Sequence, residues 1–370
     1  MVNNSLEYYL NIAGVCIKII SNNEISNLVA DNLNAINKQS INDVDIVLNL
    51  QNSEIENYEP SIYSAKGNMN FNKTEYYVDY LTECNYLVKN IFHTDMTEVT
   101  INTSKTTFKK ELKGLFKNKN IMTRDMILSY YLFWYILYIE LLNKNKAFIH
   151  AGIFEKDNKA TIITGTGGCG KTSTLFKILE NETTKYISED FGIVDIDGNT
   201  YFNPKPISIY ATDIEFGQSL LNNALKEFSL LENLQWTLSR KLLKRNPMCK
   251  SKPKSIMGNR IAEISKIKNV LYFIRTNTNE MDVKDIAIDE LAERVSDASM
   301  RELKTLNELL LLLRANAPSD FAFPSFDNIR KKTKEIYLKN FSLTNNKIVK
   351  IPYKTSPGDL VSFLNSKGLI

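Results

Sequence analysis

Short runs of alternating apolar and polar residues, separated by polar turns, fill the first hundred residues of the chain. The runs are rich in β-branched and aromatic residues, which is typical of strands that bury one face. They read YYLNIAGVCIKII, VDIVLNL, EYYVDYL, YLVKNIF and TEVTIN. A single helix is expected among them, around residues 24–36. We therefore predict a mixed, largely antiparallel β-rich module over residues 1–120, ending in a basic stretch whose charge faces solvent.

The pattern changes at residues 126–142, where MILSYYLFWYILYIELL is apolar on all sides. Such a segment is either a buried helix or a membrane span. It is short for a span, contains Glu140 and is rich in tyrosine. Thr123 and Asp125 in front of it suit a helix cap and first turn. We therefore predict a buried helix and no membrane partner.

Strands and helices follow one another from residue 146 onward. KAFIHAGIFEKDNKATIIT predicts a hairpin around the turn EKDNK, KYISEDFGIVDIDGNTYF predicts three short strands, and NVLYFIRTN predicts one more. Helices are expected over 213–245, twice within 285–316, and at the final PGDLVSFLNS. This pattern predicts a second domain over residues 121–370, and an α/β (α+β) class for the whole chain.

One glycine-rich stretch, TIITGTGGCGKTST, lies between a predicted strand and a predicted helix. It fits the phosphate-loop pattern G-x-x-x-x-G-K-[ST]. In such a loop the glycines let backbone N–H groups point at a phosphate, the lysine reaches the β- and γ-phosphates, and the hydroxyl binds Mg²⁺. A glycine-rich turn before an ordinary helix is the alternative, but it does not require Lys-Thr after the last glycine. The residues expected to contact ATP are Gly165, Thr166, Gly167, Gly168, Cys169, Gly170, Lys171, Thr172 and Ser173.

Two adjacent carboxylates, Glu189 and Asp190, follow the predicted strand KYIS. We expect that strand to run beside the one that carries the loop, so that its end faces the nucleotide. One carboxylate could then accept a proton from an attacking hydroxyl, and the other could hold Mg²⁺. A solvated turn is the alternative. His150, in the apolar segment FIHAGIF, is expected either in the interior or near the γ-phosphate.

The order of FIHAGIF, TGTGGCGKTS and ISEDFGIVD resembles HPr kinase/phosphorylase and its relative phosphoenolpyruvate carboxykinase. The segments YYLNIAGVCIKI and FNPKPISIY also look like HPr-kinase-related proteins of biosynthetic clusters. The resemblance covers roughly residues 146–210, and it implies a carboxykinase-like P-loop core of mixed sheet with helices. The HPr kinase C-terminal substrate loop has no counterpart here, so HPr is not the expected substrate. The chain is also too short for a carboxykinase.

The resemblance also implies roles for individual residues. It makes Glu189 the catalytic base, although the family usually has the shorter aspartate at this position. It assigns Asp190 and the Thr172 hydroxyl to Mg²⁺, and it gives His150 and Lys171 catalytic roles.

A basic segment, SRKLLKRNPMCKSKPKSIMGNR over residues 239–260, contains no acidic residue. It is either a solvated loop or helix end, or a clamp for an anionic substrate. Arg260 and Arg275 are candidates for stabilising charge on a transferred phosphoryl group.

Composition and net charge say little about which molecules the protein binds. The net charge of +4 gives no argument for nucleic acid, and the four scattered cysteines lack metal-site spacing. They indicate a reducing cytoplasm, and the N-terminal residues do not read as a signal peptide. The sequence is compatible with a homo-oligomer.

The expected function is an ATP-dependent kinase, a phosphotransferase with an alcohol group as acceptor. The acceptor hydroxyl would belong to a serine of a peptide or protein, a small-molecule alcohol or a sugar. A regulatory P-loop NTPase and a nucleotide-binding interaction protein are the alternatives.

Overall fold

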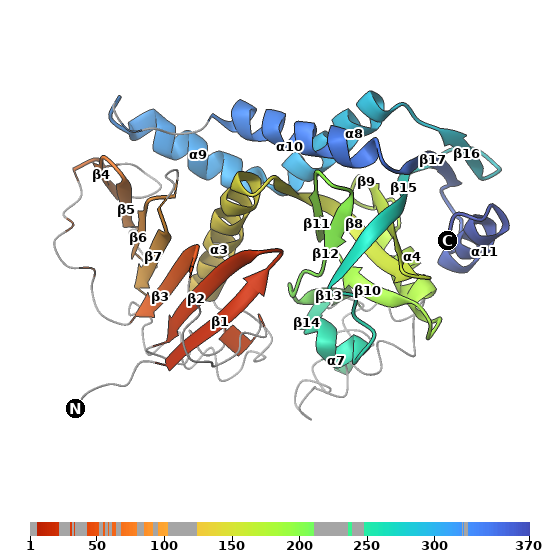
Figure 1. The fold of residues 1–370 in the computed structure, drawn as a ribbon, viewed down its shortest axis with the longest axis horizontal. Coiled ribbons are helices and arrows are strands. Elements are labelled where there is room, and N and C mark those ends of the chain that lie inside the picture. Colours follow the sequence, from red (N-terminus) through yellow and green to blue (C-terminus); the bar gives the residue numbers. More distant parts are fainter. Residues whose placement is uncertain are drawn as a thin grey trace. The chain divides into compact units, whose positions relative to one another are not determined.

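A computed structural model shows a mixed α/β chain with two mixed sheets and several helices (Figure 1). It describes residues 6–21, 30–31, 33, 43–51, 55, 58, 61–63, 68–79, 85–91, 95–102, 124–210, 236–238, 248–319, 321 and 325–370. Contacts divide the chain into two compact units. The first holds Met1–Lys144 and Lys304–Ile329, and the second holds Asn145–Leu303 and Arg330–Ile370. This division falls at Lys144, whereas the sequence analysis set its boundary at residue 120.

The first unit is built on a seven-stranded sheet with the order β1-β2-β3-β7-β6-β5-β4. Its strands are β1 (Leu6–Ile12), β2 (Val15–Ser21), β3 (Ile46–Gln51), β4 (Asn68–Asn72), β5 (Glu75–Asp79), β6 (Asn85–Lys89) and β7 (Thr97–Asn102). The β2–β3 and β3–β7 pairs are parallel and the other pairs are antiparallel. The predicted mixed, largely antiparallel module is therefore confirmed.

Two details of this sheet differ from the sequence prediction. The run YYLNIAGVCIKII is a hairpin of two strands, because Ala13 and Gly14 take the positive φ values of a tight turn. Strand β4 was not predicted, since its asparagine-rich sequence resembles a turn. Most of the helix expected over residues 24–36 lies outside the described residues.

The long apolar segment is the helix α3 (Arg124–Asn143), and its side chains are buried from Leu132 to Leu142. Glu140 accepts a hydrogen bond from Thr97 Oγ1 at 2.7 Å, so its carboxylate has a partner in the interior of the unit. The predicted cap, Thr123, lies outside the described residues. Within the described part of the chain, no helix is long and apolar enough to cross a membrane.

The second unit contains an eight-stranded sheet with the order β10-β8-β11-β12-β15-β17-β16, in which β9 pairs with both β8 and β15. Its strands are β8 (Lys146–Lys156), β9 (Lys159–Gly165), β10 (Lys185–Ser188), β11 (Phe191–Asp195), β12 (Asn199–Tyr201), β15 (Ile264–Thr276), β16 (Asp282–Asp285) and β17 (Asn345–Pro352). Strands β8 and β15 are long enough for their two halves to pair with different neighbours. The predicted hairpin and short strands are all present.

Four strands of this sheet end at one edge. Strands β9, β15 and β17 run parallel, and β10 runs in the same direction because both β9 and β10 are antiparallel to β8. We call the edge where these four strands end the carboxyl edge. We expected β10 to run directly beside β9. Instead β8 lies between them and forms hydrogen bonds with both. The phosphate-loop motif and the acidic pair nevertheless lie at the same edge.

Helices cover the second sheet. They include α4 (Lys171–Leu179), α7 (Pro253–Met257), α8 (Ile288–Glu302), most of α10 (Phe326–Phe341) and α11 (Pro357–Ser366). Helices α4 and α8 contact β8 and β9, and α11 packs on α4. The two helices predicted within 285–316 are α8 and α9 (Lys304–Asn316), and they belong to different units. Of the helix expected over 213–245, only residues 236–238 are described, and they are helical. Strands β13 (Ile207–Tyr210) and β14 (Met248–Ser251) form a separate hairpin-like pair.

Candidate active site

The glycine-rich loop connects β9 to α4 at the carboxyl edge, so the strand and helix that the motif requires are both present. Gly165 has φ 141°, and a Cβ there would lie 2.5 Å from the Phe273 carbonyl oxygen of the neighbouring strand. Only glycine allows this close approach. A Cβ at Gly167 or Gly168 would meet nothing within 4 Å. The loop is therefore fixed against β15 on one side and open on the other.

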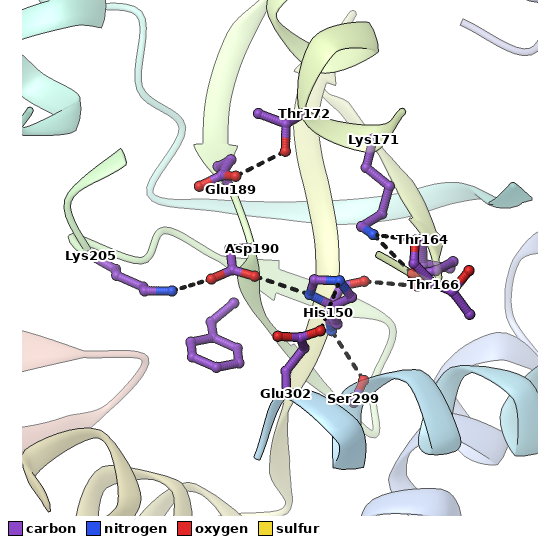
Figure 2. A network of polar contacts seen from close by, with 12 residues as sticks. His150, Thr164, Thr166, Lys171, Thr172, Glu189, Asp190, Lys205, Ser299 and Glu302 are labelled. Atoms are coloured by element: carbon purple, nitrogen blue, oxygen red, sulfur yellow. Dashed lines mark hydrogen bonds and ion pairs between the residues drawn. The ribbon is translucent and has the colours of Figure 1, made fainter. Parts of the chain in front are cut away.

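Lys171, the first residue of α4, points back into the loop. Its Nζ donates hydrogen bonds to the carbonyl oxygens of Gly165 at 2.9 Å and Thr166 at 3.1 Å (Figure 2). The side chain is only 7% exposed. Burial raises the pKa of the Cys169 thiol, so that thiol remains neutral beside the ammonium group. The Lys171 ammonium group therefore lies inside the loop, beside a neutral thiol.

The Thr172 hydroxyl meets the first residue of the acidic pair. Thr172 Oγ1 donates a hydrogen bond to Glu189 Oε1 at 3.0 Å, across 17 positions of sequence (Figure 2). A hydroxyl and a carboxylate oxygen together are the hard donors that Mg²⁺ prefers. The next hydroxyl, that of Ser173, donates instead to the Gly170 carbonyl oxygen and closes the first turn of the helix.

Asp190 points away from Glu189. Its φ of 71° is left-handed, and this turn of the backbone sends the two adjacent carboxylates in different directions (Figure 2). One carboxylate oxygen lies 3.0 Å from His150 Nδ1, and the other contacts Lys205 Nζ. Burial alone would raise the pKa of Asp190, but the Lys205 charge and the His150 contact outweigh it and hold that pKa well below its usual value.

His150 lies on β8 directly opposite Phe191, the first residue of β11. Its Nε2 is 3.8 Å from Glu302 Oε1, at the C-terminal end of α8. The potential ligand atoms of His150, Asp190 and Glu302 all lie within 4.8 Å of one another, a set that could hold a divalent metal ion. Lys205 already neutralises part of the Asp190 charge and would compete with such an ion. His150 is thus a buried side chain that faces two carboxylates, in agreement with the expected interior position. Its proximity to a γ-phosphate stays a prediction.

The structure therefore brings Glu189 to Thr172, next to Lys171 in the sequence, and places Asp190 in a second group with His150. Asp190, expected to share Mg²⁺ with Thr172, does not contact that hydroxyl. Sequence reasoning missed Lys205 and Glu302. The only signal for Lys205 was its place in FNPKPISIY, a segment noted for its resemblance, and Glu302 ends a helix that carries no motif.

Arg260 lies far from the loop. Its Nη1 donates to the carbonyl oxygens of Leu179 at 2.8 Å and Asn181 at 3.2 Å. These carbonyls lie at and just after the C-terminal end of α4, and a helix of nine residues places its two ends about 13 Å apart. In this structure its guanidinium bonds to carbonyl groups that a helix end leaves unpaired, and its role in stabilising a phosphoryl group stays a prediction.

Arg275 contacts the backbone of the loop from the side of β15 and β17. Its Nε donates to the Cys169 carbonyl oxygen at 3.2 Å, and its Nη1 donates to the Pro352 and Thr355 carbonyl oxygens at 2.8 and 3.2 Å. A Cβ added to Gly170 would come within 2.9 Å of Nη2. Arg275 thus ties the glycine-rich loop to the segment after β17. Residues 239–247 of the basic segment lie outside the described residues.

No protein-family model matches the chain, and no curated protein shows significant sequence similarity to it. The resemblance noted in the sequence therefore stays a prediction that rests on short segments.

Proposed function

We propose that this chain is an ATP-dependent kinase that transfers the γ-phosphoryl group to the hydroxyl of a peptide serine, a small alcohol or a sugar. The observation that carries the proposal is the contact between Thr172 and Glu189 beside Lys171. A hydroxyl and a buried ammonium group at the start of α4 lie at one loop, and a carboxylate from the end of β10, 17 positions later in the sequence, meets the hydroxyl. This is the set of groups that phosphoryl transfer needs.

The residues present fit a magnesium nucleotide. The open side of the loop at Gly167 and Gly168 leaves room for a phosphate. Lys171 and the N-terminus of α4 provide positive charge, and Thr172 provides a metal ligand. When bound, ATP supplies the γ-phosphoryl group and Mg²⁺ neutralises charge on its oxygens. In this proposal Lys171 turns from the loop carbonyls toward the phosphate oxygens and stabilises the charge that develops there.

The two carboxylates receive different roles. A general base works best with a pKa near the operating pH, and the depressed pKa of Asp190 makes it a weak proton acceptor. Glu189 accepts a hydrogen bond from the Thr172 hydroxyl, so its carboxylate lies at the first turn of α4, beside the expected phosphate position. We therefore assign proton acceptance from the attacking hydroxyl to Glu189. Asp190, together with His150, is assigned to the metal and phosphate side of the site.

ATP consumption measured with and without hydroxyl acceptors tests this proposal. Serine-containing peptides, small alcohols and sugars serve as separate acceptor pools, with transfer of the labelled γ-phosphoryl group as the readout. Turnover that depends on one pool supports the kinase. Turnover that is independent of every acceptor supports a regulatory NTPase, in which Glu189 orients water instead. Nucleotide binding without turnover supports an interaction protein.

A further inference from the structure

A pocket of about 480 Å³ lies between the segment after β15 and the segment after β17. This volume is within the range of small-molecule sites, about 300–1,000 Å³. Asn279, Met281 and Glu280 line it from the first segment, and Pro352 and Thr355 line it from the second. Phe363 of α11 closes one side. Of these residues, only Pro352 and Thr355 were met above, where their carbonyl oxygens accept hydrogen bonds from Arg275.

The pocket shares the carboxyl edge with the glycine-rich loop. Gly165, the last residue of β9, pairs with Phe273 of β15, and Arg275 of the same strand pairs with Ile351 of β17. The Arg275 guanidinium bonds to the loop at Cys169 and to the pocket wall at Pro352. One side chain therefore bridges the two sites. Ligands of open α/β sheets bind outside the carboxyl ends of adjacent strands, which is where both sites lie.

The lining of the pocket suits a flat, uncharged ring. Met281 and Phe363 are partly buried against the hydrophobic core of the unit and present apolar surface. Asn279 and Thr355 add hydrogen-bonding groups. The two carboxylates of Glu280 and Asp359 outnumber the single ammonium group of Lys354, so the lining carries net negative charge. Such a lining disfavours a second phosphate and favours the N–H edge of a heterocycle.

We propose that this pocket binds the purine base of the nucleotide whose phosphates occupy the glycine-rich loop. The inference rests on the proposed function and adds the part of the nucleotide that is recognised away from the phosphates. The apolar side chains would contact the faces of the ring, and the polar groups would meet its edge. A bicyclic purine fills more of this space than a pyrimidine does.

Binding of two probes with Mg²⁺ to the full chain separates the base from the phosphates. ATP carries both, whereas inorganic tripolyphosphate carries only the phosphates. The variants are Phe363→Ala, which removes apolar surface, and Asn279→Trp, which fills the pocket from an exposed position. Leu343→Ala, a truncation of a side chain that is 61% exposed, is the matched control. Thermal unfolding of each variant checks that it is folded. If Phe363→Ala is unstable, the ATP affinity of Asn279→Trp alone tests the base pocket.

Both pocket variants should bind ATP about tenfold more weakly or worse, since loss of one base-stacking contact is typically worth 1–3 kcal/mol. Their tripolyphosphate affinity should match that of the wild type, and the wild type should prefer ATP to CTP. If the folded variants bind ATP as the wild type does, or lose both probes equally, the base pocket is wrong while the kinase proposal stands. If the wild type binds neither probe, the proposed function fails and the inference fails with it.

Discussion

The two units accommodate buried charge in different ways. In the first unit, the Glu140 carboxylate lies in the interior and accepts hydrogen bonds from Thr97 and Asn143, both neutral. In the second unit, ionisable side chains from different segments lie at the carboxyl edge. They are His150 of β8, Lys171 of α4, Asp190 and Lys205. Burying charge is unfavourable unless the charge is paired. A single buried carboxylate with neutral hydrogen-bond partners, such as Glu140, fits a structural role. Several ionisable side chains gathered beside a phosphate-loop motif are instead typical of a functional site.

This comparison predicts that substitutions at the carboxyl edge change activity more than stability, and that substitution of Glu140 changes stability alone.

The largest effect is expected from Lys171→Ala. The ammonium group stabilises charge on the transferred phosphoryl group, and loss of such a cation lowers the rate roughly 10³–10⁵-fold. Steady-state kcat/KM with the identified acceptor measures it. Lys177→Ala is the matched control, because Lys177 lies on the same helix and pairs with Glu180. Near wild-type turnover of Lys171→Ala would remove the phosphate-loop interpretation.

Glu189→Gln should lower the rate of the chemical step by roughly 10²–10⁴-fold, the usual contribution of a general base. The change in ATP affinity should be small, because the amide can still accept the hydrogen bond from Thr172. Single-turnover rates are needed, since product release can hide the chemical step. Glu180→Gln serves as the control. A loss of less than about tenfold would mean that Glu189 only shapes the site.

The sequence predicted the parts of this site that belong to continuous segments. Lys171 and Thr172 follow from the motif, and the contact of Glu189 with Thr172 agrees with the expected meeting of the motif and the acidic pair. It did not predict that β8 separates β9 from β10, because strand order depends on pairing between distant segments. The left-handed turn at Asp190, which sends its carboxylate to His150 and Lys205, also leaves no sequence pattern.

The fold shows the same limit. A long apolar run identified α3, and two β-rich runs around a turn identified the β8–β9 hairpin. Helix α11 was also expected, and its cap Ser356 accepts a hydrogen bond from the Asp359 backbone N–H. Helix α10 and strand β17 were not predicted, because lysines and asparagines dilute their apolar pattern. The bonds of Arg260 to the end of α4 could not be predicted, because a basic segment does not indicate which carbonyl groups its side chains will meet.

Asp190→Asn should weaken Mg-ATP binding by about tenfold, the lower end of the range for groups that support a metal site. The substitution should also change how the free energy of unfolding depends on pH in the acid range. The depressed pKa of Asp190 means that its ionised form stabilises the fold above the unfolded-state pKa of about 4, and that this contribution is lost as the pH falls. The variant should therefore be less stable at neutral pH and less sensitive to acid.

Titration calorimetry and unfolding at several pH values measure both effects for Asp190→Asn. Asp197→Asn, in an exposed turn of the same unit, is the control. Unchanged Mg-ATP affinity would separate Asp190 from the nucleotide and leave it a structural partner of His150.

The smallest effect is expected from Glu140→Gln in the first unit. Burial raises the pKa of Glu140, so the wild-type fold loses stability as the pH rises from about 4.5 through the higher folded-state pKa. Glutamine does not ionise, so the variant should not lose stability in this way. Its amide oxygen can still accept the hydrogen bond from Thr97. The unfolding midpoint at neutral pH should rise by about 2–4 °C, the shift that 1 kcal/mol produces in a unit of this size. Phosphoryl transfer should not change. A loss of activity in this variant would contradict the division between a structural charge and a functional group.

The central claim is that Lys171, Thr172 and Glu189 surround the reacting phosphate. A crystal structure with Mg²⁺ and a non-hydrolysable ATP analogue tests it most directly. We predict the β-phosphate within the loop of residues 165–172, the metal ion on Thr172 Oγ1, and the γ-phosphate facing Glu189. A nucleotide bound elsewhere, with Lys171 still bonded to the Gly165 and Thr166 carbonyl oxygens, would contradict the account.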